Sequence, residues 1–159
     1  MNATKCEIAG PLGMDTPGRD LMRYGMFLFL LGLLTGIFEQ RFTNVRMGLS
    51  AHLEGVMNGT FLIALGAIWT QVRLPRLARH VAFATALYGT YSNWGTTTVA
   101  AMFGTAANNP IAAAGQNGLP WQENLIAAAF LSVALSMLVS TAVILWGLLA
   151  PPAQTSTVE

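Results

Sequence analysis

The chain has 159 residues, of which 53% are hydrophobic and only 9% are charged. A typical soluble domain carries about 25% charged residues, so this composition favours a single domain with the lipid bilayer as its solvent. The formal net charge of +1 argues against a nucleic-acid partner, and a single cysteine, Cys6, excludes a disulfide framework and a cysteine metal cluster.

Four apolar segments follow a polar start, and they predict an all-α fold, an integral membrane four-helix bundle. Residues 1–22 lack the layout of a signal peptide and are predicted to be a cytoplasmic tail. Within the transmembrane domain, residues 23–149, helices are expected at about 23–38, 49–72, 81–105 and 122–149, judged against the roughly 20 residues that span a hydrocarbon core. Residues 150–159 are expected to form a second polar tail.

The basic residues predict the orientation of these helices. Arg41 and Arg46 fall on one predicted side of the membrane, and six other basic residues fall on the opposite side, namely Lys5, Arg19, Arg23, Arg73, Arg76 and Arg79. Short cytoplasmic segments carry the excess of lysine and arginine. Both termini are therefore predicted to be cytoplasmic.

The second expected helix carries the chemically most informative residues. His52, Glu54 and Asn58 lie within the otherwise apolar run RMGLSAHLEGVMNGTFLIAL. A polar group at this depth costs free energy, by a few kcal/mol for a charged carboxylate, which makes each a candidate functional residue. At about 100° per residue, His52 shares one face with Gly55 and Gly59, and Glu54 shares another with Asn58. A ring of protomers would serve both faces, with a ligand between neighbours that meets His52 of one and Glu54 or Asn58 of the next.

The histidine and the glycines each allow two interpretations. Gly32 with Gly36, and Gly55 with Gly59, have the small-residue spacing that lets membrane helices pack closely. Alternatively, Gly55 and Gly59 leave a slot for a flat cofactor beside His52. The imidazole of His52 is either a hydrogen-bonded structural group or the axial ligand of a haem iron, whose other side stays open for chemistry.

Glu54 is a proton carrier, an acid catalyst or the ion-pair partner of Arg46. His80 follows Arg79 at the predicted cytoplasmic edge and is expected to be solvated. With one histidine inside the membrane, a chain of bis-histidine haems for transmembrane electron transfer is not expected.

The third expected helix is unusually rich in aromatic and polar residues near its middle. Trp94 lies beside Asn93 and close to Tyr88, Tyr91 and Thr97. Trp94 either fills the core of the bundle or forms an aromatic wall for a flat ligand.

Three motifs, RMGLSAHLEGVMNG, ALYGTYSNW and GLPWQE, in this order and with these spacings, resemble the hydroxylaminobenzene mutase family of small bacterial membrane proteins. The resemblance covers roughly residues 23–149. That family rearranges hydroxylaminobenzene to 2-aminophenol during nitroarene degradation. The resemblance implies an isomerase, an intramolecular hydroxyl-transferring mutase, with several spans in the bacterial inner membrane.

The pattern of His52, five residues, Asn58 and Gly59 is also similar to that of styrene oxide isomerase, a more distant four-helix membrane enzyme. That enzyme holds a ferric haem b between the subunits of a trimer. This resemblance implies a homotrimer with iron bound axially by His52, a cofactor site that includes Gly55, Gly59 and Arg46, and Asn58 as a holder of the substrate oxygen.

One position departs from the isomerase pattern. The isomerase also holds the substrate oxygen with a tyrosine, and Thr97 stands at the matching place here. Either Tyr91 or Tyr88 serves from a neighbouring turn, or no residue does.

The resemblance and the residues together suggest a mechanism. Ferric iron would act as a Lewis acid on the oxygen of the N–O bond. Asn58 would orient the substrate, and Glu54 would take the ortho proton. The expected pocket comprises five residues of the third helix, which would clamp the ring and exclude water: Tyr88, Tyr91, Asn93, Trp94 and Thr97.

Two other functions remain open from the sequence. A membrane carboxylate such as Glu54 would also suit a proton-coupled exporter of small aromatic compounds. The same mutase reaction would alternatively run on Glu54 and Arg46 as acid–base residues without a metal.

Overall fold

The computed structural model describes residues 16–105 and 109–150, and every regular element in these ranges is a helix. The elements in chain order are α1 (Thr16–Phe38), η1 (Glu39–Arg41), α2 (Val45–Ile68), η2 (Trp69–Gln71), α3 (Arg76–Phe103), α4 (Pro110–Ala113) and α5 (Pro120–Leu149). The predicted all-α class is confirmed. Most of the two predicted tails, residues 1–15 and 151–159, lies outside the described part.

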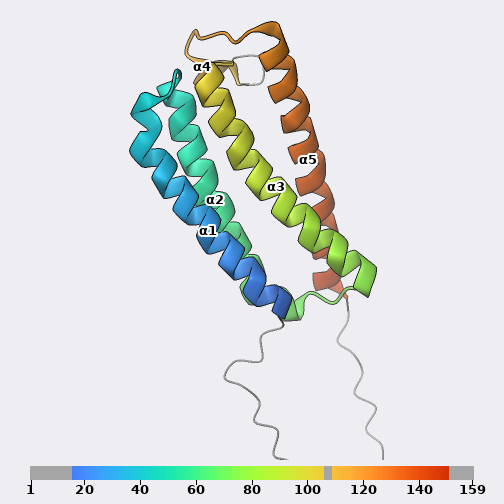
Figure 1. Cartoon of the computed structure of the whole chain (residues 1–159). Helices are drawn as coiled ribbons and strands as arrows, with labels where there is room; N and C mark the ends of the chain where they lie inside the picture. Colours follow the sequence, from blue (N-terminus) through green and yellow to red (C-terminus); the bar gives the residue numbers. More distant parts are fainter. Residues whose placement is uncertain (1–15, 106–108, 151–159) are drawn as a thin grey trace, which may run out of the picture.

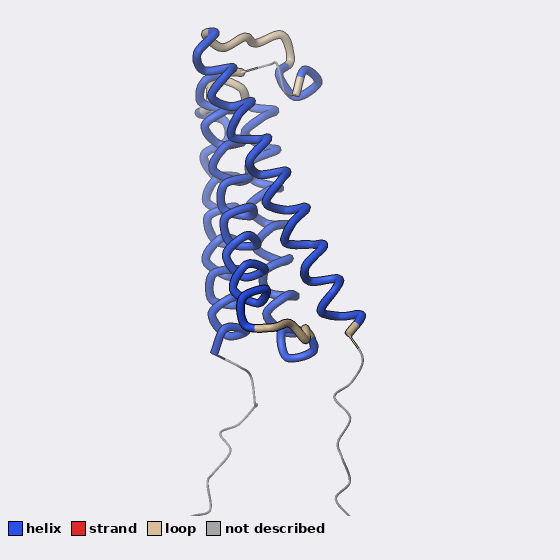
Figure 2. Tube along the Cα trace, turned by 90° about the vertical axis from the view of Figure 1, so that its right-hand side faces the viewer, coloured by secondary structure: helices blue, strands red, loops and turns tan. Residues whose placement is uncertain are grey.

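The four long helices run alternately up and down, and each packs against the next along the chain (Figure 1). The start of α1, the connection between α2 and α3, and the end of α5 lie together at one end of the molecule (Figure 1), the end from which the two grey traces leave in Figure 2. The opposite end carries η1 and α4. Arg73 in this connection and Arg76 and Arg79 in the first turn of α3 therefore lie at the end where α1 begins and α5 finishes.

Several helices begin earlier than expected. α1 begins at Thr16 and α3 at Arg76, before the first residues of the apolar segments. The length of an apolar segment reflects the thickness of the hydrocarbon core. The helix itself continues into the interface, where charged side chains remain hydrated. The start of α2 is fixed by Asn44, whose side chain accepts a hydrogen bond from the backbone nitrogen of Met47 at 3.1 Å.

Asn44 also joins distant parts of the chain. Its Nδ2 donates to the carbonyl oxygens of Ala112 at 2.9 Å and Ala113 at 3.0 Å, and its backbone nitrogen donates to Ala101. Because Asn44 is buried, these bonds satisfy polar groups that water does not reach. They attach the short helix α4 to the start of α2.

In the part of the chain that the structure describes, three segments are long and apolar enough to cross a membrane: Thr16–Arg41, Val45–Gln71 and Pro120–Leu149. The remaining expected span is α3, which has 28 residues but carries many hydroxyl groups. Several of these donate to the backbone one turn earlier, as Thr90 does to Ala86 and Thr98 to Trp94, each at 2.8 Å. Its position between α2 and α5 places part of this polar surface inside the protein.

Glycines bring α1 and α2 into backbone contact. A Cβ atom added at Gly25 would lie 2.7 Å from the carbonyl oxygen of Gly59, and one added at Gly32 would lie 2.6 Å from the nitrogen of Val56. Such approaches are possible only without side chains. The two helices are therefore fixed in register along their whole length.

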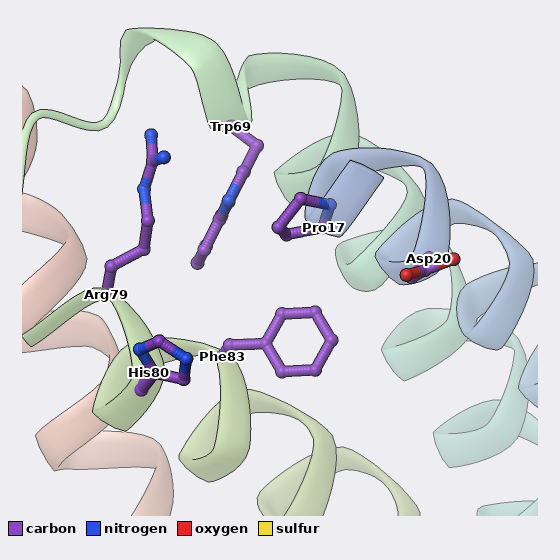
Figure 3. A pocket seen from close by; sticks show the side chains of 6 residues that line it. All are labelled: Pro17, Asp20, Trp69, Arg79, His80 and Phe83. Carbon is purple, nitrogen blue, oxygen red and sulfur yellow. The ribbon is translucent and has the colours of Figure 1, made fainter. Parts of the chain in front are cut away.

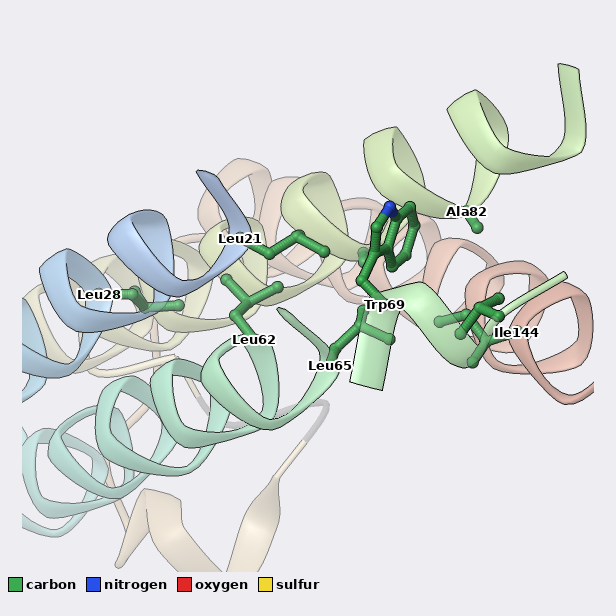
Figure 4. Packing of buried hydrophobic residues seen from close by; sticks show 9 residues of the cluster. Leu21, Leu28, Leu62, Leu65, Trp69, Ala82 and Ile144 are labelled. Carbon is green, nitrogen blue, oxygen red and sulfur yellow. The ribbon is translucent and has the colours of Figure 1, made fainter. Parts of the chain in front are cut away.

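A hydrophobic cluster fills the space between the helices near the end where α1 begins. Its members include Leu21, Leu28, Leu62, Leu65, Trp69, Ala82 and Ile144 (Figure 4). Trp69 is fully buried there, whereas Trp121 and Trp146 on α5 are more than half exposed. The exposed pair matches the interfacial role expected of tryptophans near helix ends.

Candidate functional site

His52 is held by the backbone of the neighbouring helix. Its Nδ1 atom lies 2.8 Å from the carbonyl oxygen of Gly32 in α1. Because a carbonyl oxygen only accepts, Nδ1 carries the ring proton and donates it. A neutral imidazole then has its lone pair on Nε2, free to bind a metal. Histidines that ligate metals use this arrangement, in which the second ring nitrogen is anchored to a carbonyl or a carboxylate.

Gly36 leaves the space that the imidazole occupies. A Cβ atom at Gly36 would lie 2.6 Å from Nδ1 of His52. The packing role predicted for Gly32 is confirmed, because a side chain there would collide with the backbone at Gly55. The α1 glycines thus both bring the two helices together and admit the ring of His52.

Of the two interpretations of Gly55 and Gly59, an open slot and close helix packing, the slot is not open in the structure. A Cβ atom at Gly59 would lie 2.6 Å from the nitrogen of Phe29, and one at Gly55 would collide with Gly32. Within one protomer this side of α2 is therefore filled by α1. The structure supports the alternative in which these glycines serve helix packing.

Glu54 lies at the interface of α2 and α3, where it accepts hydrogen bonds from two amides. Its Oε2 atom accepts from Nδ2 of Asn58 at 3.1 Å and from Nδ2 of Asn93 in α3. All three side chains are partly buried. Because each amide turns its NH₂ group to the carboxylate, each Oδ1 atom points elsewhere as an acceptor.

The ion pair with Arg46, one of the three roles left open for Glu54, is not found among the described residues. Among the described residues the one salt bridge joins Arg23 to Asp20 at 3.2 Å. Arg46 is exposed in the first turn of α2, two turns before Glu54. The amides of Asn58 and Asn93 supply the polar contacts instead.

Trp94 points into the space between α1, α2 and α3. Its Nε1 donates to Oγ1 of Thr35 at 3.0 Å, and a Cβ atom at Gly55 would lie 2.9 Å from its Cδ1 atom. Thr97 is buried and donates to the carbonyl of Asn93 at 2.9 Å. These contacts support the interpretation of Trp94 as a core residue, and they leave the hydroxyl of Thr97 committed to its own helix.

The two tyrosines of α3 lie at a groove against α1. The groove has a volume of about 470 Å³ and is lined by Tyr24, Phe27, Leu87, Tyr88 and Tyr91. The hydroxyl of Tyr91 donates to the carbonyl of Tyr24 at 2.8 Å, and that of Tyr88 shares a hydrogen bond of 2.8 Å with Ser132. Neither hydroxyl contacts His52 or Glu54.

The structure therefore places the predicted site residues on separate sides of α2. At about 100° per residue, His52 and Glu54 lie about 160° apart around the helix axis. His52 faces α1 and Glu54 faces α3, which confirms the two polar faces predicted from the sequence. Between them runs an exposed apolar strip that includes Leu49, Leu53 and Met57.

Two contributors to the site were not predicted from the sequence. Thr35 binds the indole of Trp94, and the Gly32 carbonyl orients His52. A lone threonine in the apolar run of α1 only weakly indicates a functional residue, and the sequence gives no indication of which backbone carbonyl will accept a hydrogen bond. Within residues 16–105 and 109–150, no group of three His, Cys, Asp or Glu side chains is arranged to hold a metal ion. A haem with one axial histidine requires no such group.

Comparisons with known proteins extend these observations. The family model described as "Styrene oxide isomerase" matches residues 18–149. Hydroxylaminobenzene mutase HabB of Ectopseudomonas oleovorans is 51% identical over 145 residues, which cover 90% of this chain and 88% of the relative. Hydroxylaminobenzene mutase HabA of the same organism is 36% identical over 130 residues, or 81% of this chain and 96% of the relative. No solved structure gave a significant match. The chain therefore belongs to the styrene oxide isomerase family and is an isomerase similar to two hydroxylaminobenzene mutases.

Proposed function

We propose that this chain rearranges hydroxylaminobenzene to 2-aminophenol within the membrane, with a ferric haem b bound by His52. The identity to two hydroxylaminobenzene mutases supports the reaction. The observation that carries the cofactor is the hydrogen bond from Nδ1 of His52 to the Gly32 carbonyl, which leaves Nε2 as the iron ligand. When bound, the ferric iron supplies a Lewis acid for the oxygen that leaves nitrogen.

The rearrangement conserves atoms and electrons. The N–O bond breaks, a C–O bond forms at the ortho carbon, and the proton displaced from that carbon balances the proton gained by nitrogen. No external electron donor is required. Bulk water would attack the electron-poor ring mainly at the para carbon, so an ortho product requires a site that excludes water.

Glu54, Asn58 and Asn93 have chemistry that suits this substrate. An arylhydroxylamine carries both an N–H and an O–H donor, and the amides offer their Oδ1 atoms as acceptors because Glu54 holds their NH₂ groups. Asn58 would thereby orient the N–O group. Glu54 uses Oε2 for both amides, and its Oε1 would take the ortho proton as the ring regains aromaticity.

In an assembly, the His52 side of α2 in one protomer would meet the Glu54 side of α2 in its neighbour. We place the active site between protomers of a homotrimer, with His52 from one protomer and Glu54 and Asn58 from its neighbour. The exposed strip of α2 at Leu49, Leu53 and Met57 supports a contact centred on this helix. Arg46 lies exposed at the start of the same helix, available to a haem carboxylate at the membrane edge.

The proposed setting is the bacterial inner membrane. All four long helices would cross it as a bundle with both termini in the cytoplasm. The connection between α2 and α3, with Arg73, and the first turn of α3, with Arg76 and Arg79, lie at the same end as the start of α1, as the positive-inside rule requires for this orientation.

The function is tested by giving hydroxylaminobenzene to sealed vesicles that contain the purified protein and separating the products by chromatography. We expect 2-aminophenol as the main product, in amounts proportional to the protein. Transport of unchanged substrate that depends on a proton gradient, without 2-aminophenol, would instead assign the chain as an exporter. 4-Aminophenol as the main product would contradict the proposed retention of oxygen beside the ring.

A further inference from the structure

The described part of the chain has pockets away from His52 and Glu54. One lies where α1 begins, has a volume of about 180 Å³, and is lined by Pro17, Asp20, Trp69, Arg79, His80 and Phe83 (Figure 3). The side chains of Asp20, Arg79 and His80 are each already hydrogen-bonded to a neighbouring group. Another pocket lies between α3 and α5, and two of its hydroxyl groups have no such partner.

The pocket between α3 and α5 opens where a row of serines that joins the two helices ends. Ser136 and Ser140 of α5 donate to backbone carbonyls of α3, at 2.9 Å and 3.4 Å. One turn further, Ser132 shares a hydrogen bond of 2.8 Å with the hydroxyl of Tyr88. Beyond this pair lies a pocket of about 350 Å³, bounded by Ile126, which packs in the hydrophobic cluster near the end of α3.

Two hydroxyl groups of α3 line this pocket unpaired. Ser92 and Thr96 lie one turn apart, on the same face of the helix as Tyr88. Thr97 and Thr98 donate to the carbonyl one turn earlier, at 2.9 Å and 2.8 Å. Within residues 16–105 and 109–150, by contrast, neither the Ser92 nor the Thr96 hydroxyl has a hydrogen-bond partner, and both oxygens remain accessible from the pocket.

The depth of these hydroxyl groups makes the unpaired state unfavourable. Ser92 and Thr96 lie near the middle of α3, and the facing wall, with Ala129 and Ser132, lies near the middle of α5. The centre of a bilayer offers no bulk water to pair with a hydroxyl group. An occupant that itself donates and accepts hydrogen bonds would remove this cost.

The other walls define the rest of such an occupant. Val99, Leu125, Ile126 and Ala129 are apolar, and none of the lining residues is charged. The volume falls within the roughly 300–1,000 Å³ that is typical of small-molecule sites. The pocket therefore suits a small neutral molecule with an apolar body and a single hydrogen-bonding group.

We propose that the pocket between α3 and α5 binds a neutral monocyclic aromatic alcohol, amine or hydroxylamine from the bilayer. Ser92 and Thr96 hydrogen-bond its polar group, and its ring packs against Leu125 and Ile126. The choice of ligand class rests on the proposed function, whose substrate and product have this chemistry. The pocket itself is separate from the proposed reaction centre, because Asn93 reaches Glu54 from an adjoining face of α3.

This site gives a place to a side chain whose role the sequence left open. Tyr88 is expected from the sequence to clamp the substrate ring near the reaction centre. In the structure it closes one end of the pocket between α3 and α5, where its hydroxyl donates to Ser132, which itself donates to the carbonyl of Ala129 at 2.7 Å. A molecule bound here would be held within the membrane beside the reaction centre.

Photolabelling of the full-length protein in phospholipid nanodiscs tests the proposal. The probe is a phenol that carries a photoreactive diazirine, and mass spectrometry of peptides locates the label. We expect label on residues 92–99 of α3 and 125–132 of α5, prevented by excess phenol or 2-aminophenol but not by toluene, which has no hydrogen-bonding group. Label confined to α2 would overturn the site, and equal protection by toluene would overturn the role of the hydroxyl groups.

Variants of the two hydroxyl residues locate the polar contact. The double variant Ser92→Ala with Thr96→Val removes both groups, and we expect probe affinity to fall about tenfold. The matched control, Thr98→Val, removes a hydroxyl group that is bonded within α3 and lies outside the pocket, and it should bind as the unchanged protein does. Unchanged affinity in the folded double variant would overturn the proposal.

A conservative pair keeps the test decisive if the double variant does not fold. Thr96→Val alone is expected to lose affinity about threefold, whereas Thr96→Ser, which keeps a hydroxyl group, should retain it. Equal affinity in these two variants would overturn the proposal.

Product formation by the same preparation of unchanged protein separates this inference from the proposed function. Label in the pocket without 2-aminophenol formation would contradict the proposed function alone. Formation of 2-aminophenol without label in the pocket would contradict this inference alone.

Discussion

The imidazole of His52 and the carbonyl of Gly32 form a hydrogen bond of 2.8 Å between two membrane helices. Close packing of glycines makes this bond possible, because the backbones of α1 and α2 come into contact near Gly55. The bond fixes the ring and its tautomer at once. A pair of helices that would otherwise pack only through apolar contact thus presents a single oriented nitrogen, Nε2.

Gly36→Ala is expected to disturb this arrangement. The new Cβ atom would lie 2.6 Å from Nδ1 of His52, so the imidazole must rotate away from Gly32. We expect haem affinity and activity to fall about 10-fold to 100-fold while the protein still inserts in the membrane. Haem content per protein gives the measurement. Gly95→Ala is the matched control, because a Cβ there would meet no atom within 4 Å apart from its chain neighbours and the nearby backbone of its own helix. Equal losses in both variants would contradict the specific role of Gly36.

Asn58→Ala is expected to keep haem but lose at least about tenfold in kcat, since the role proposed for Asn58 is to orient substrate rather than to hold the cofactor. Glu54→Gln should give a similar loss, because a neutral amide no longer accepts equally well from both Asn58 and Asn93. Steady-state kinetics with the haem spectrum recorded on the same samples checks both variants. Loss of haem in Asn58→Ala would place this residue in the cofactor site instead.

Mixed assemblies test whether the active site is shared between protomers. His52→Ala and Asn58→Ala are each expected to be nearly inactive alone. When the two are expressed together, some interfaces combine an intact His52 with an intact Asn58, so activity should return to a substantial fraction of normal. The assay compares co-expressed variants with separately purified variants mixed in detergent. No recovery in folded mixed oligomers would show that both residues act within one protomer.

Trp94→Phe distinguishes a core residue from an aromatic wall. The variant loses the bond from Nε1 to Thr35, so the free energy of unfolding should fall by about 0.5–1.5 kcal/mol. The ratio of kcat to KM for hydroxylaminobenzene should change less than threefold, because the ring faces α1 and α2. Thermal unfolding in detergent and steady-state kinetics measure the two effects. A large change in KM at unchanged stability would show instead that Trp94 lines the substrate pocket.

The sequence predicted the features that follow from its composition and from the period of the α-helix. Apolar runs located the helices, and the 100° period correctly separated His52 from Glu54 on α2. Partners distant in sequence were not predictable: Thr35 and Trp94 lie 59 residues apart, and Asn93 reaches Glu54 from another helix. The sequence left open whether Gly55 and Gly59 form a slot or pack against a helix, because a bare glycine face does not reveal what covers it; in the structure α1 covers it.

The central claim is iron bound at His52, and an absorption spectrum tests it most directly. The protein is purified in mild detergent from haem-replete cells, together with His52→Ala and the control His80→Ala, which changes an exposed histidine. The account predicts a strong Soret band in the unchanged protein and in His80→Ala, and its loss together with activity in His52→Ala. A colourless protein that still forms 2-aminophenol would contradict the account and move the chemistry to Glu54 and its neighbours.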